Sequence, residues 1–505
     1  MAVGQARRAC LLVAVLLGSA ATAISGCATS GNQCVTVPVD REPALHPTPC
    51  PAGAPSNATC GTLSVPEAGV AANRNAGEGS ANTATSCLLD IAWIILTPES
   101  VTNEVPLFIL GGGPGDPLLA RIDEVAALTD AAAPGKVVVA HDPRGVGSSA
   151  PTLDCRDIPV EEGMDRDAWL ASCANTYRTR GHDDRAYRTA VLVEDVVELA
   201  SELGFDTFDV LGISYGSRLA QELVRTHPER VRALVLDAAT PTDTPLLEVG
   251  AGHLRDALAR VSSDCDDSAV CGSRFPDLAS QVDDTLVRLT NDPAPLALGE
   301  STFPLSPELY ASTLSILLSR GALLPAVPAY IAEVHAQNYD AVTFLLSNIP
   351  VPETAFFMHH AVMCAEELPR NERARAIADR TSFPAYSEEL LYDTLTATCE
   401  AMMLPTDGSP PTQTPVTVPT LALTGRYDPL SPTSNWPEFS DRFSNGTLVD
   451  IPTGHGTLRD PCGQQAIGAF LDNPGTFALP ACTRTQATPD FSDTSFEILG
   501  PALAR

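Results

Sequence analysis

The chain has 505 residues, of which 44% are hydrophobic, so it is long enough for a large buried core and more than one structural unit. Its 62 acidic residues outnumber its 31 basic residues and give a formal net charge of −31. Because so acidic a surface repels phosphate backbones, the composition argues against nucleic-acid binding.

Residues 1–27 are predicted to be a secretory signal. Two arginines precede a short apolar run at 11–17, which is too short to span a membrane. The segment ends in the letters ISGC, closed by Cys27. This ending resembles a bacterial lipobox, which implies cleavage before Cys27 and lipidation of its thiol; an ordinary signal peptide is the alternative. We therefore expect an exported bacterial protein, either secreted or held at the cell membrane only by this N-terminal lipid.

The cysteine content also indicates export. The chain has 14 cysteines, and twelve remain if Cys10 leaves with the signal and Cys27 is lipidated. In an oxidising compartment such a set forms disulfides. Spacing predicts the local pairs Cys155–Cys173, Cys265–Cys271, Cys364–Cys399 and Cys462–Cys482, and leaves open how Cys34, Cys50, Cys60 and Cys87 pair among themselves. Zinc ligation is the alternative, but no CxxC pair or Cys/His cluster supports it, and we expect no metal.

Residues 28–60 are rich in Pro, Ala, Thr and Ser and are predicted to be a tether and an N-terminal arm held by disulfides. Apolar runs that alternate with helical stretches follow it. The predicted strands of the first core segment (61–244) are 87–96, 106–110, 136–142, 208–214 and 233–238, and helical stretches are predicted at 187–205 and 217–230. We expect organised structure to begin near Thr62. This order predicts an α/β fold, with a mostly parallel sheet and helices on both faces.

The alternation stops after the first core segment. Residues 245–410 show a helical pattern without buried strands, which predicts an inserted helical cap. A stretch rich in Pro and Thr then leads to strands at 420–425 and 447–452, in a second core segment at 411–485. Residues 486–505 are expected to be a C-terminal tail.

The strongest chemical signal is the G-x-S-x-G pattern centred on Ser214, between a predicted strand and a predicted helix. This context is typical of a nucleophile elbow, a turn so tight that glycines are needed two residues from the serine. The helix that follows favours negative charge developing at the serine. We therefore predict that Ser214 is a nucleophile.

A serine hydroxyl needs a base, and in this type of site the acid and the histidine follow the serine in chain order. His455 is the one histidine after His360, and glycines flank it just beyond a predicted strand. Asp428 lies in the loop after the predicted strand 420–425, 27 residues before His455. We therefore predict that its carboxylate orients His455. Asp237 is the rival acid, and Asp441 and Asp450 are weaker alternatives.

The glycine run GGGPG at 111–115 follows another predicted strand. We expect it to supply an oxyanion hole, with Gly113 and the residue after the nucleophile, Tyr215, donating backbone N–H groups. The alternative is a tight turn without a catalytic role. A phosphate cradle is disfavoured because the G-x-G-x-x-G spacing is absent. The next loop, DPRGVGSS at 142–149, is expected to fix neighbouring loops through internal hydrogen bonds.

Taken together, the motifs GGGPG, DPRGVGSS, GISYGS, GRYDP and GHG resemble those of the tripeptidyl aminopeptidase and prolyl iminopeptidase group of α/β-hydrolase serine peptidases, over residues 60–485. The resemblance implies an α/β-hydrolase fold with a helical cap, the triad Ser214, Asp428 and His455, and release of short units from peptide N-termini without a cofactor. The sequence departs from the pattern at Gly111, where relatives often have histidine.

An enzyme that acts on free N-termini has to bind an α-ammonium group, and a carboxylate in the cap would do so. Glu366 is the predicted anchor, although a solvated helix face is the plainer interpretation. A carboxylesterase or lipase with the same triad is the main alternative, since fold and triad do not separate amide from ester substrates. A non-catalytic binding protein on this scaffold is the third. A serine at the elbow disfavours hydrolases with an aspartate nucleophile, and the oligomeric state stays open.

Overall fold

A computed structural model describes residues 34–68, 85–299, 301–349, 353–379, 383, 388–408, 415–485 and 488–491. The chain divides into the units Met1–Gln33 and Cys34–Arg505, and the description concerns the second. The predicted signal and Cys27 lie outside the described residues. Within those residues, no helix combines the length and apolar character needed to cross a membrane.

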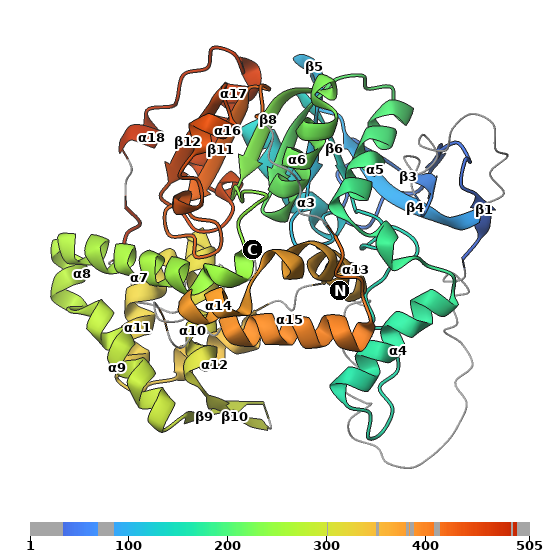
Figure 1. Ribbon diagram of the computed structural model, residues 1–505. Helices are drawn as coiled ribbons and strands as arrows, with labels where there is room; N and C mark the ends of the chain where they lie inside the picture. The colour runs from blue at the N-terminus through green and yellow to red at the C-terminus, as the bar shows by residue number, and fades with distance from the viewer. Residues whose placement is uncertain are drawn as a thin grey trace. The chain divides into compact units, whose positions relative to one another are not determined.

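A single large sheet forms the centre of this unit (Figure 1). Its strands are β1 (Thr36–Pro38), β2 (Ala44–Pro47), β3 (Ala58–Pro66), β4 (Thr85–Leu96), β5 (Asn103–Leu110), β6 (Lys136–His141), β7 (Phe208–Ile213), β8 (Val231–Asp237), β11 (Thr420–Gly425) and β12 (Gly446–Ile451). The strand order is β12-β11-β8-β7-β5-β6-β4-β3-β2, and β1 pairs with β4. Neighbours from β6 through β5 to β12 are parallel, whereas β1 to β4 pair antiparallel. The predicted, mostly parallel sheet is confirmed.

Helices cover both faces of the sheet, as the alternation of strands and helices predicts. Along β5, Phe108 and Leu110 pack with the helices α5 (Thr189–Glu202) and α6 (Tyr215–Thr226). The intervening residues Leu107 and Ile109 face the opposite side, where α3 (Ile122–Ala132) and α17 (Pro461–Asp472) lie. Successive strand residues point to opposite faces, so a strand buried on both sides is apolar throughout. The further helices outside the insertion are α4 (Arg166–Thr179), α16 (Phe439–Arg442) and α18 (Cys482–Thr485).

Residues 245–410, called the insertion from here on, connect β8 to β11. They hold the helices α7 (Gly250–Asp267), α8 (Ala269–Arg274), α9 (Leu278–Asn291), α10 (Pro307–Ser319), α11 (Val327–His335), α12 (Asp340–Asn348), α13 (Phe356–Val362), α14 (Arg373–Asp379) and α15 (Glu388–Met402). Helices α7 to α12 share a hydrophobic core, which also includes Tyr427 and Phe491. Figure 1 shows the insertion helices gathered at one end of the sheet, next to the loops that follow its strands.

Two details differ from the sequence-based expectation. A hairpin of β9 (Ala294–Leu298) and β10 (Ser301–Leu305) lies in the insertion, where we expected helices alone. Each of its strands contains a proline, which weakens a strand signal, and the two strands pair only with each other. Strands β1 to β3 also begin before Thr62, within the stretch that composition marked as a tether.

Six disulfides join the twelve cysteines of the described residues. The four local pairs are as predicted: Cys155–Cys173, Cys265–Cys271, Cys364–Cys399 and Cys462–Cys482. The remaining pairs are Cys34–Cys87, which ties β1 to β4, and Cys50–Cys60. Such a set is typical of an oxidising compartment.

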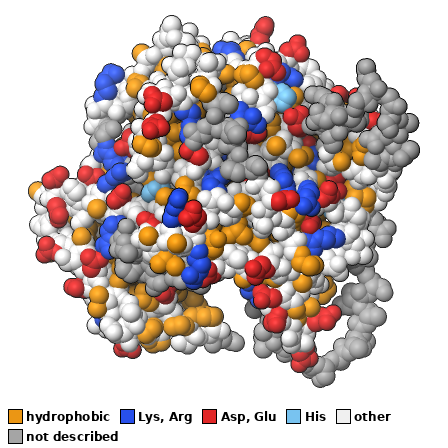
Figure 2. All heavy atoms as spheres, in the orientation of Figure 1, with side chains coloured by type: hydrophobic (Ala, Val, Ile, Leu, Met, Phe, Trp, Pro, Cys, Tyr) orange, Lys and Arg blue, Asp and Glu red, His pale blue; other side chains and the backbone are white. Residues whose placement is uncertain are grey.

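Acidic and basic side chains are interspersed over the face in Figure 2, so the negative charge of the chain is not gathered there in one patch.

Candidate functional site

Ser214 occupies a sharp turn between β7 and α6. Its backbone angles are φ 56° and ψ −120°, a combination that a residue with a side chain seldom adopts and that marks a strained site. A Cβ atom placed on Gly212 would lie 2.3 Å from the carbonyl oxygen of Gly216, and one on Gly216 would lie 2.1 Å from that of Leu110. The two glycines of the motif are therefore required by close backbone contacts, as the elbow prediction assumed.

The loops after β11 and β12 bring Asp428 and His455 together. Asp428 Oδ2 accepts a hydrogen bond from His455 Nδ1 at 2.8 Å and another from Ser431 Oγ at 2.6 Å. Its other oxygen accepts the backbone N–H of Leu430 at 2.8 Å. Asp428 is 1% exposed, so these donors replace the water that an ionised carboxylate would otherwise require.

Each member of this pair shifts the pKa of the other. Burial opposes the charge on both groups, but their mutual attraction and hydrogen bond outweigh it. The pKa of Asp428 is therefore held below its usual value, and the pKa of His455 is raised above 6.5. The arrangement favours an ionised Asp428 and a more basic His455, as a general base and its orienting acid require.

Asp237, the rival acid, has a different place. It ends β8, where its carbonyl accepts the N–H of Ser214 at 2.9 Å. Its buried carboxylate accepts the N–H groups of Thr457 and Leu458 at 2.6 and 3.0 Å. Asp237 therefore joins the elbow to the loop just after His455.

Across the described residues, no hydrogen bond joins Ser214 Oγ to His455. Such bonds are often long in ligand-free enzymes and tighten when substrate binds.

Two sets of backbone groups adjoin the Ser214 side chain. A Cβ atom on Gly112 would lie 3.2 Å from Ser214 Cβ and 3.7 Å from Ser214 Oγ, so the glycine loop passes beside the hydroxyl. Gly113 has φ 108°, a conformation that favours glycine. Tyr215 is the first residue of α6, and N–H groups in the first helical turn have no partner within the helix. The loop and the helix start thus lie where an oxyanion hole would be.

Hydrogen bonds join the loop at 142–149 to the segment that follows the glycine loop. Asp142, which is fully buried, accepts the N–H groups of Leu119 and Ser148 at 2.9 and 2.8 Å, and burial raises its pKa to about 6. Arg144 forms a buried ion pair with Asp195 at 2.6 Å. These internal bonds agree with the predicted role of the segment in fixing loops.

Comparison with known proteins extends this geometry. A family model described as "alpha/beta hydrolase fold" matches residues 105–260, which include the elbow and the glycine loop. The chain has the α/β-hydrolase fold. A second model, described as "TAP-like protein", matches residues 384–480 of this hydrolase, which include Asp428 and His455.

Individual relatives of the hydrolase are distant. It is 23% identical to the serine protease Hip1 of Mycobacterium tuberculosis over 526 aligned residues, which cover 91% of this chain and 95% of the relative. A solved proline iminopeptidase from Mycobacterium smegmatis is 18% identical, with a TM-score of 0.39, over 77% of this chain and 96% of that one. A solved esterase from Thermogutta terrifontis is 16% identical, with a TM-score of 0.35, over 78% and 97%. The family models and Hip1 confirm the resemblance to α/β-hydrolase serine peptidases.

Glu366, the predicted ammonium anchor, lies in a π-helical turn after α13 and close to the elbow. Its two carboxylate oxygens accept the N–H and the hydroxyl of Thr189 at 2.7 and 2.6 Å, and that hydroxyl lies 2.7 Å from the Tyr215 hydroxyl. Glu366 is therefore two hydrogen bonds from the residue after Ser214. Burial raises its pKa above the usual value, and each oxygen retains acceptor capacity.

The neighbouring Glu367 belongs to the same predicted anchor region, 364–367, but it holds the insertion to the elbow helix instead. It forms buried ion pairs with Arg218 of α6 at 2.7 Å and with Arg370 at 3.4 Å. It also accepts the N–H of Leu246 and the amide of Asn371. The sequence shows two adjacent glutamates. It does not show that arginines saturate the carboxylate of one of them and not that of the other.

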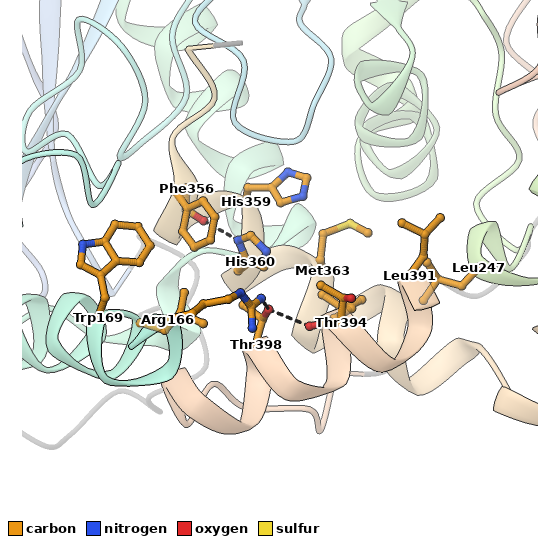
Figure 3. Close-up of a pocket in the computed structure, with 12 residues that line it drawn as sticks. Arg166, Trp169, Leu247, Phe356, His359, His360, Met363, Leu391, Thr394 and Thr398 are labelled. Carbon is orange, nitrogen blue, oxygen red and sulfur yellow. Dashed lines mark hydrogen bonds between the residues drawn. The ribbon is translucent and has the colours of Figure 1, made fainter. Parts of the chain in front are cut away.

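A pocket of about 380 Å³ lies between α4, α13 and α15. Figure 3 shows Trp169 and Leu247 at its two ends, with Phe356 and Met363 between them in that view. His359, also in its lining, contacts the Pro114 carbonyl at 2.8 Å, which places one edge of the pocket against the glycine loop. Burial lowers the pKa of His359 below its usual value, which favours the neutral imidazole. The lining is mostly apolar, although Arg166 and Thr398 also belong to it.

One group of described residues has the composition of a metal site. Ligand atoms of Glu67, Cys87 and His182 lie within 4.8 Å of one another. The Cys87 sulfur is already bonded to Cys34, and Glu67 accepts hydrogen bonds from His182 and Tyr187. A thiolate is needed for ligation, so this group does not fit a metal while the disulfide is intact.

Proposed function

We propose that this hydrolase is a serine exopeptidase that removes short units from peptide N-termini through an acyl-enzyme. Ser214 Oγ attacks the scissile carbonyl carbon while His455 takes the hydroxyl proton and then delivers it to the departing amine. Water, deprotonated by His455, cleaves the resulting ester, releases the acid product and restores Ser214. The observation that carries the proposal is the hydrogen bond between the buried Asp428 and His455, whose loop Asp237 joins to the elbow.

The glycine loop and the start of α6 would bind the oxyanion. Backbone N–H groups of Gly113 and Tyr215 are the proposed donors, because the loop passes beside Ser214 and α6 begins at Tyr215. Such preorganised donors stabilise the charge that develops on the carbonyl oxygen, and no metal or cofactor is needed for this step.

Glu366 is the proposed anchor for the substrate α-ammonium. The elbow, Thr189 and Glu366 form a continuous hydrogen-bonded path, so an ammonium at Glu366 would be held near the nucleophile. Burial raises the pKa of Glu366, and a bound cation would favour its ionised form. The apolar pocket beside the glycine loop would take a hydrophobic side chain of the same substrate.

The disulfides and the predicted signal support an exported location for the enzyme. Six disulfides indicate an oxidising compartment, and a signal at residues 1–27 would provide export. Lipidation at Cys27 would leave the mature enzyme anchored at the cell membrane. Mass spectrometry of the mature N-terminus tests this, because an unmodified N-terminus at another residue contradicts the anchor.

Matched chromogenic substrates test the proposed activity. The mature protein and its Ser214→Ala variant are assayed on a peptide anilide with a free N-terminus, the same anilide after acetylation, and a short-chain ester. Turnover of the free-amine anilide alone, lost in Ser214→Ala, is the expected result. Equal turnover of the acetylated anilide removes the exopeptidase claim, and turnover of the ester alone leaves a carboxylesterase with the same triad.

A further inference from the structure

Three arginines from separate parts of the chain surround the loop that carries His455. Arg459 follows His455 by four residues, and its Nη1 would lie 3.5 Å from a Cβ atom placed on Gly456. On the insertion side, the N–H of His455 donates to the carbonyl of Ser319 at 2.7 Å, and Arg320 is the next residue. These contacts place Arg459 and the backbone next to Arg320 beside the same short loop.

The third arginine comes from the start of α3, shortly after the glycine loop. Arg121 immediately precedes α3, and Glu124 in the first turn of that helix pairs with Arg459 at 2.5 Å. The pKa of Arg320 is lowered by burial and by the positive charges of Arg459 and Arg121. Arg320 is therefore the arginine that the positive charges of Arg459 and Arg121 disfavour.

Two arginines of the cluster lack a counter-charge of their own, whereas Arg459 pairs with Glu124. Among the described residues, Arg121 and Arg320 make no side-chain hydrogen bond or ion pair, although Arg320 is half-buried. The chain has twice as many acidic residues as basic ones, 62 against 31, so acidic partners are abundant. A partly buried guanidinium without an anion is unfavourable, and an anion from outside the chain would relieve both the desolvation and the repulsion.

The position of the cluster indicates which part of a substrate would supply that anion. The departing amine has to receive its proton from His455, so the portion of the peptide beyond the scissile bond begins at this histidine. The Glu366 anchor is reached along a different path, through Thr189 and Tyr215. The arginines accordingly lie where the leaving portion would extend, and the amine anchor lies with the acyl portion.

We propose that Arg121, Arg320 and Arg459 form a subsite for a carboxylate in the leaving portion of the peptide. This subsite rests on the proposed exopeptidase function. A guanidinium donates two parallel hydrogen bonds to a carboxylate, which gives the pair both strength and a fixed orientation. The carboxylate has two sources: the C-terminus of a short peptide, or an acidic side chain just beyond the cleaved bond.

Three peptides with one acyl unit test the subsite in the mature enzyme. Their leaving portions are Ala-Ala as the free acid, Ala-Ala amide and Asp-Ala amide, and an anilide of the same acyl unit carries no carboxylate. We expect kcat/KM to be about tenfold higher for a carboxylate-bearing peptide than for Ala-Ala amide, because one charge-assisted hydrogen-bonded pair strengthens binding by about that factor. Preference for the free acid identifies the C-terminus as ligand, and preference for Asp-Ala amide identifies a side chain.

The variants separate the arginines from the catalytic machinery. Arg320→Gln and Arg121→Gln should each reduce the preference several-fold and leave anilide turnover unchanged. Arg320→Lys should keep part of the preference, and Arg274→Gln, in α8 of the insertion, is the matched control and should keep all of it. Equal kcat/KM values for the three peptides in the wild-type enzyme, or a preference that survives in both glutamine variants, would overturn the proposal.

A binding measurement keeps the subsite testable if the exopeptidase proposal fails. In that case no variant cleaves the anilide, and calorimetry on the Ser214→Ala protein compares an acetylated tripeptide acid with its amide. Tighter binding of the acid that disappears in the Ser214→Ala/Arg320→Gln double variant supports the carboxylate subsite on its own. Equal binding of acid and amide rejects it.

Discussion

The loops at the end of the sheet and the insertion above them are built by different means. In the loops, Asp428 and Asp237 use both carboxylate oxygens on donors of their own chain, and the positions of these donors follow from strand ends. In the insertion, Glu366 and Glu367 reach the elbow from a single π-helical turn, one with spare acceptor capacity and the other saturated by arginines. We therefore propose that the reaction chemistry belongs to the sheet, whereas the anchor for the substrate amine belongs to the insertion.

The largest effect should come from removing the base on the sheet side. His455→Ala leaves Ser214 without a proton acceptor, and we expect kcat to fall by about 10⁶-fold on any substrate, as for the loss of a triad histidine elsewhere. Single-turnover and steady-state kinetics measure this loss, with circular dichroism as the control for folding. A fall of less than about a hundredfold would show that another group serves as base.

Asp428→Asn should produce the next largest loss. The amide has no charge to stabilise the His455 imidazolium and disfavours the correct tautomer, so kcat should fall by about 10⁴-fold. Asp450→Asn is the matched control, because Asp450 lies on the neighbouring strand and pairs with Arg426 instead. If the control lost as much activity as Asp428→Asn, Asp428 would not be the orienting acid.

The saturated glutamate of the insertion should matter for stability. Glu367→Gln leaves Arg218 buried without its counter-charge, which we expect to lower the free energy of unfolding by about 3–5 kcal/mol. Urea denaturation measures the change. Glu372→Gln, on an exposed residue nearby, should change it by less than about 0.5 kcal/mol. A neutral Glu367→Gln would mean that the insertion is held to α6 by other contacts.

The unsaturated glutamate should affect binding instead. In Glu366→Gln, kcat/KM for free-amine peptides should fall by about a hundredfold, mostly through KM, because a charge-assisted bond to the ammonium is lost. Turnover of the ester should change little. Equal losses on the ester and on the free-amine peptide would assign Glu366 to the support of Thr189 and Tyr215 rather than to the substrate.

The smallest expected effect is a displacement of the pH profile. His455 must be neutral to act as base, and its pKa is raised above 6.5 by Asp428, so kcat/KM should rise through a pKa above 6.5. The raised pKa of His455 also contributes to the free energy of unfolding. This contribution is complete below the pKa of histidine in the unfolded chain, and it is lost as the pH rises through the pKa of His455 in the folded protein. An acid limb at or below pH 6 would contradict the proposed coupling.

Particular residues show how far the sequence carries. Strand ends at Ser214, Asp428 and His455 could be located because apolar runs stop there, and neighbouring parallel strands bring such ends to one edge of the sheet. The glycines at 212 and 216 were recognisable because close backbone contacts require them. The pairing of Cys364 with Cys399 followed from spacing within one helical region.

The remaining features depend on contacts that sequence spacing does not encode. The prolines of the β9–β10 hairpin concealed two strands that pair only with each other, and β1 to β3 are short strands inside a stretch of tether-like composition. Glu366 and Glu367 are chemically identical neighbours, and only the arrival of Arg218 and Thr189 from distant positions distinguishes them. The approach of Arg121, Arg320 and Arg459 to one another is of the same kind.

The central claim is that Ser214 is the nucleophile activated by His455. The most direct test is to treat the mature protein with a fluorophosphonate, digest it and locate the modified residue by mass spectrometry. The account predicts stoichiometric labelling at Ser214, slowed by several orders of magnitude in His455→Ala. Labelling at another serine, or labelling of Ser214 that is equally fast without His455, would contradict it.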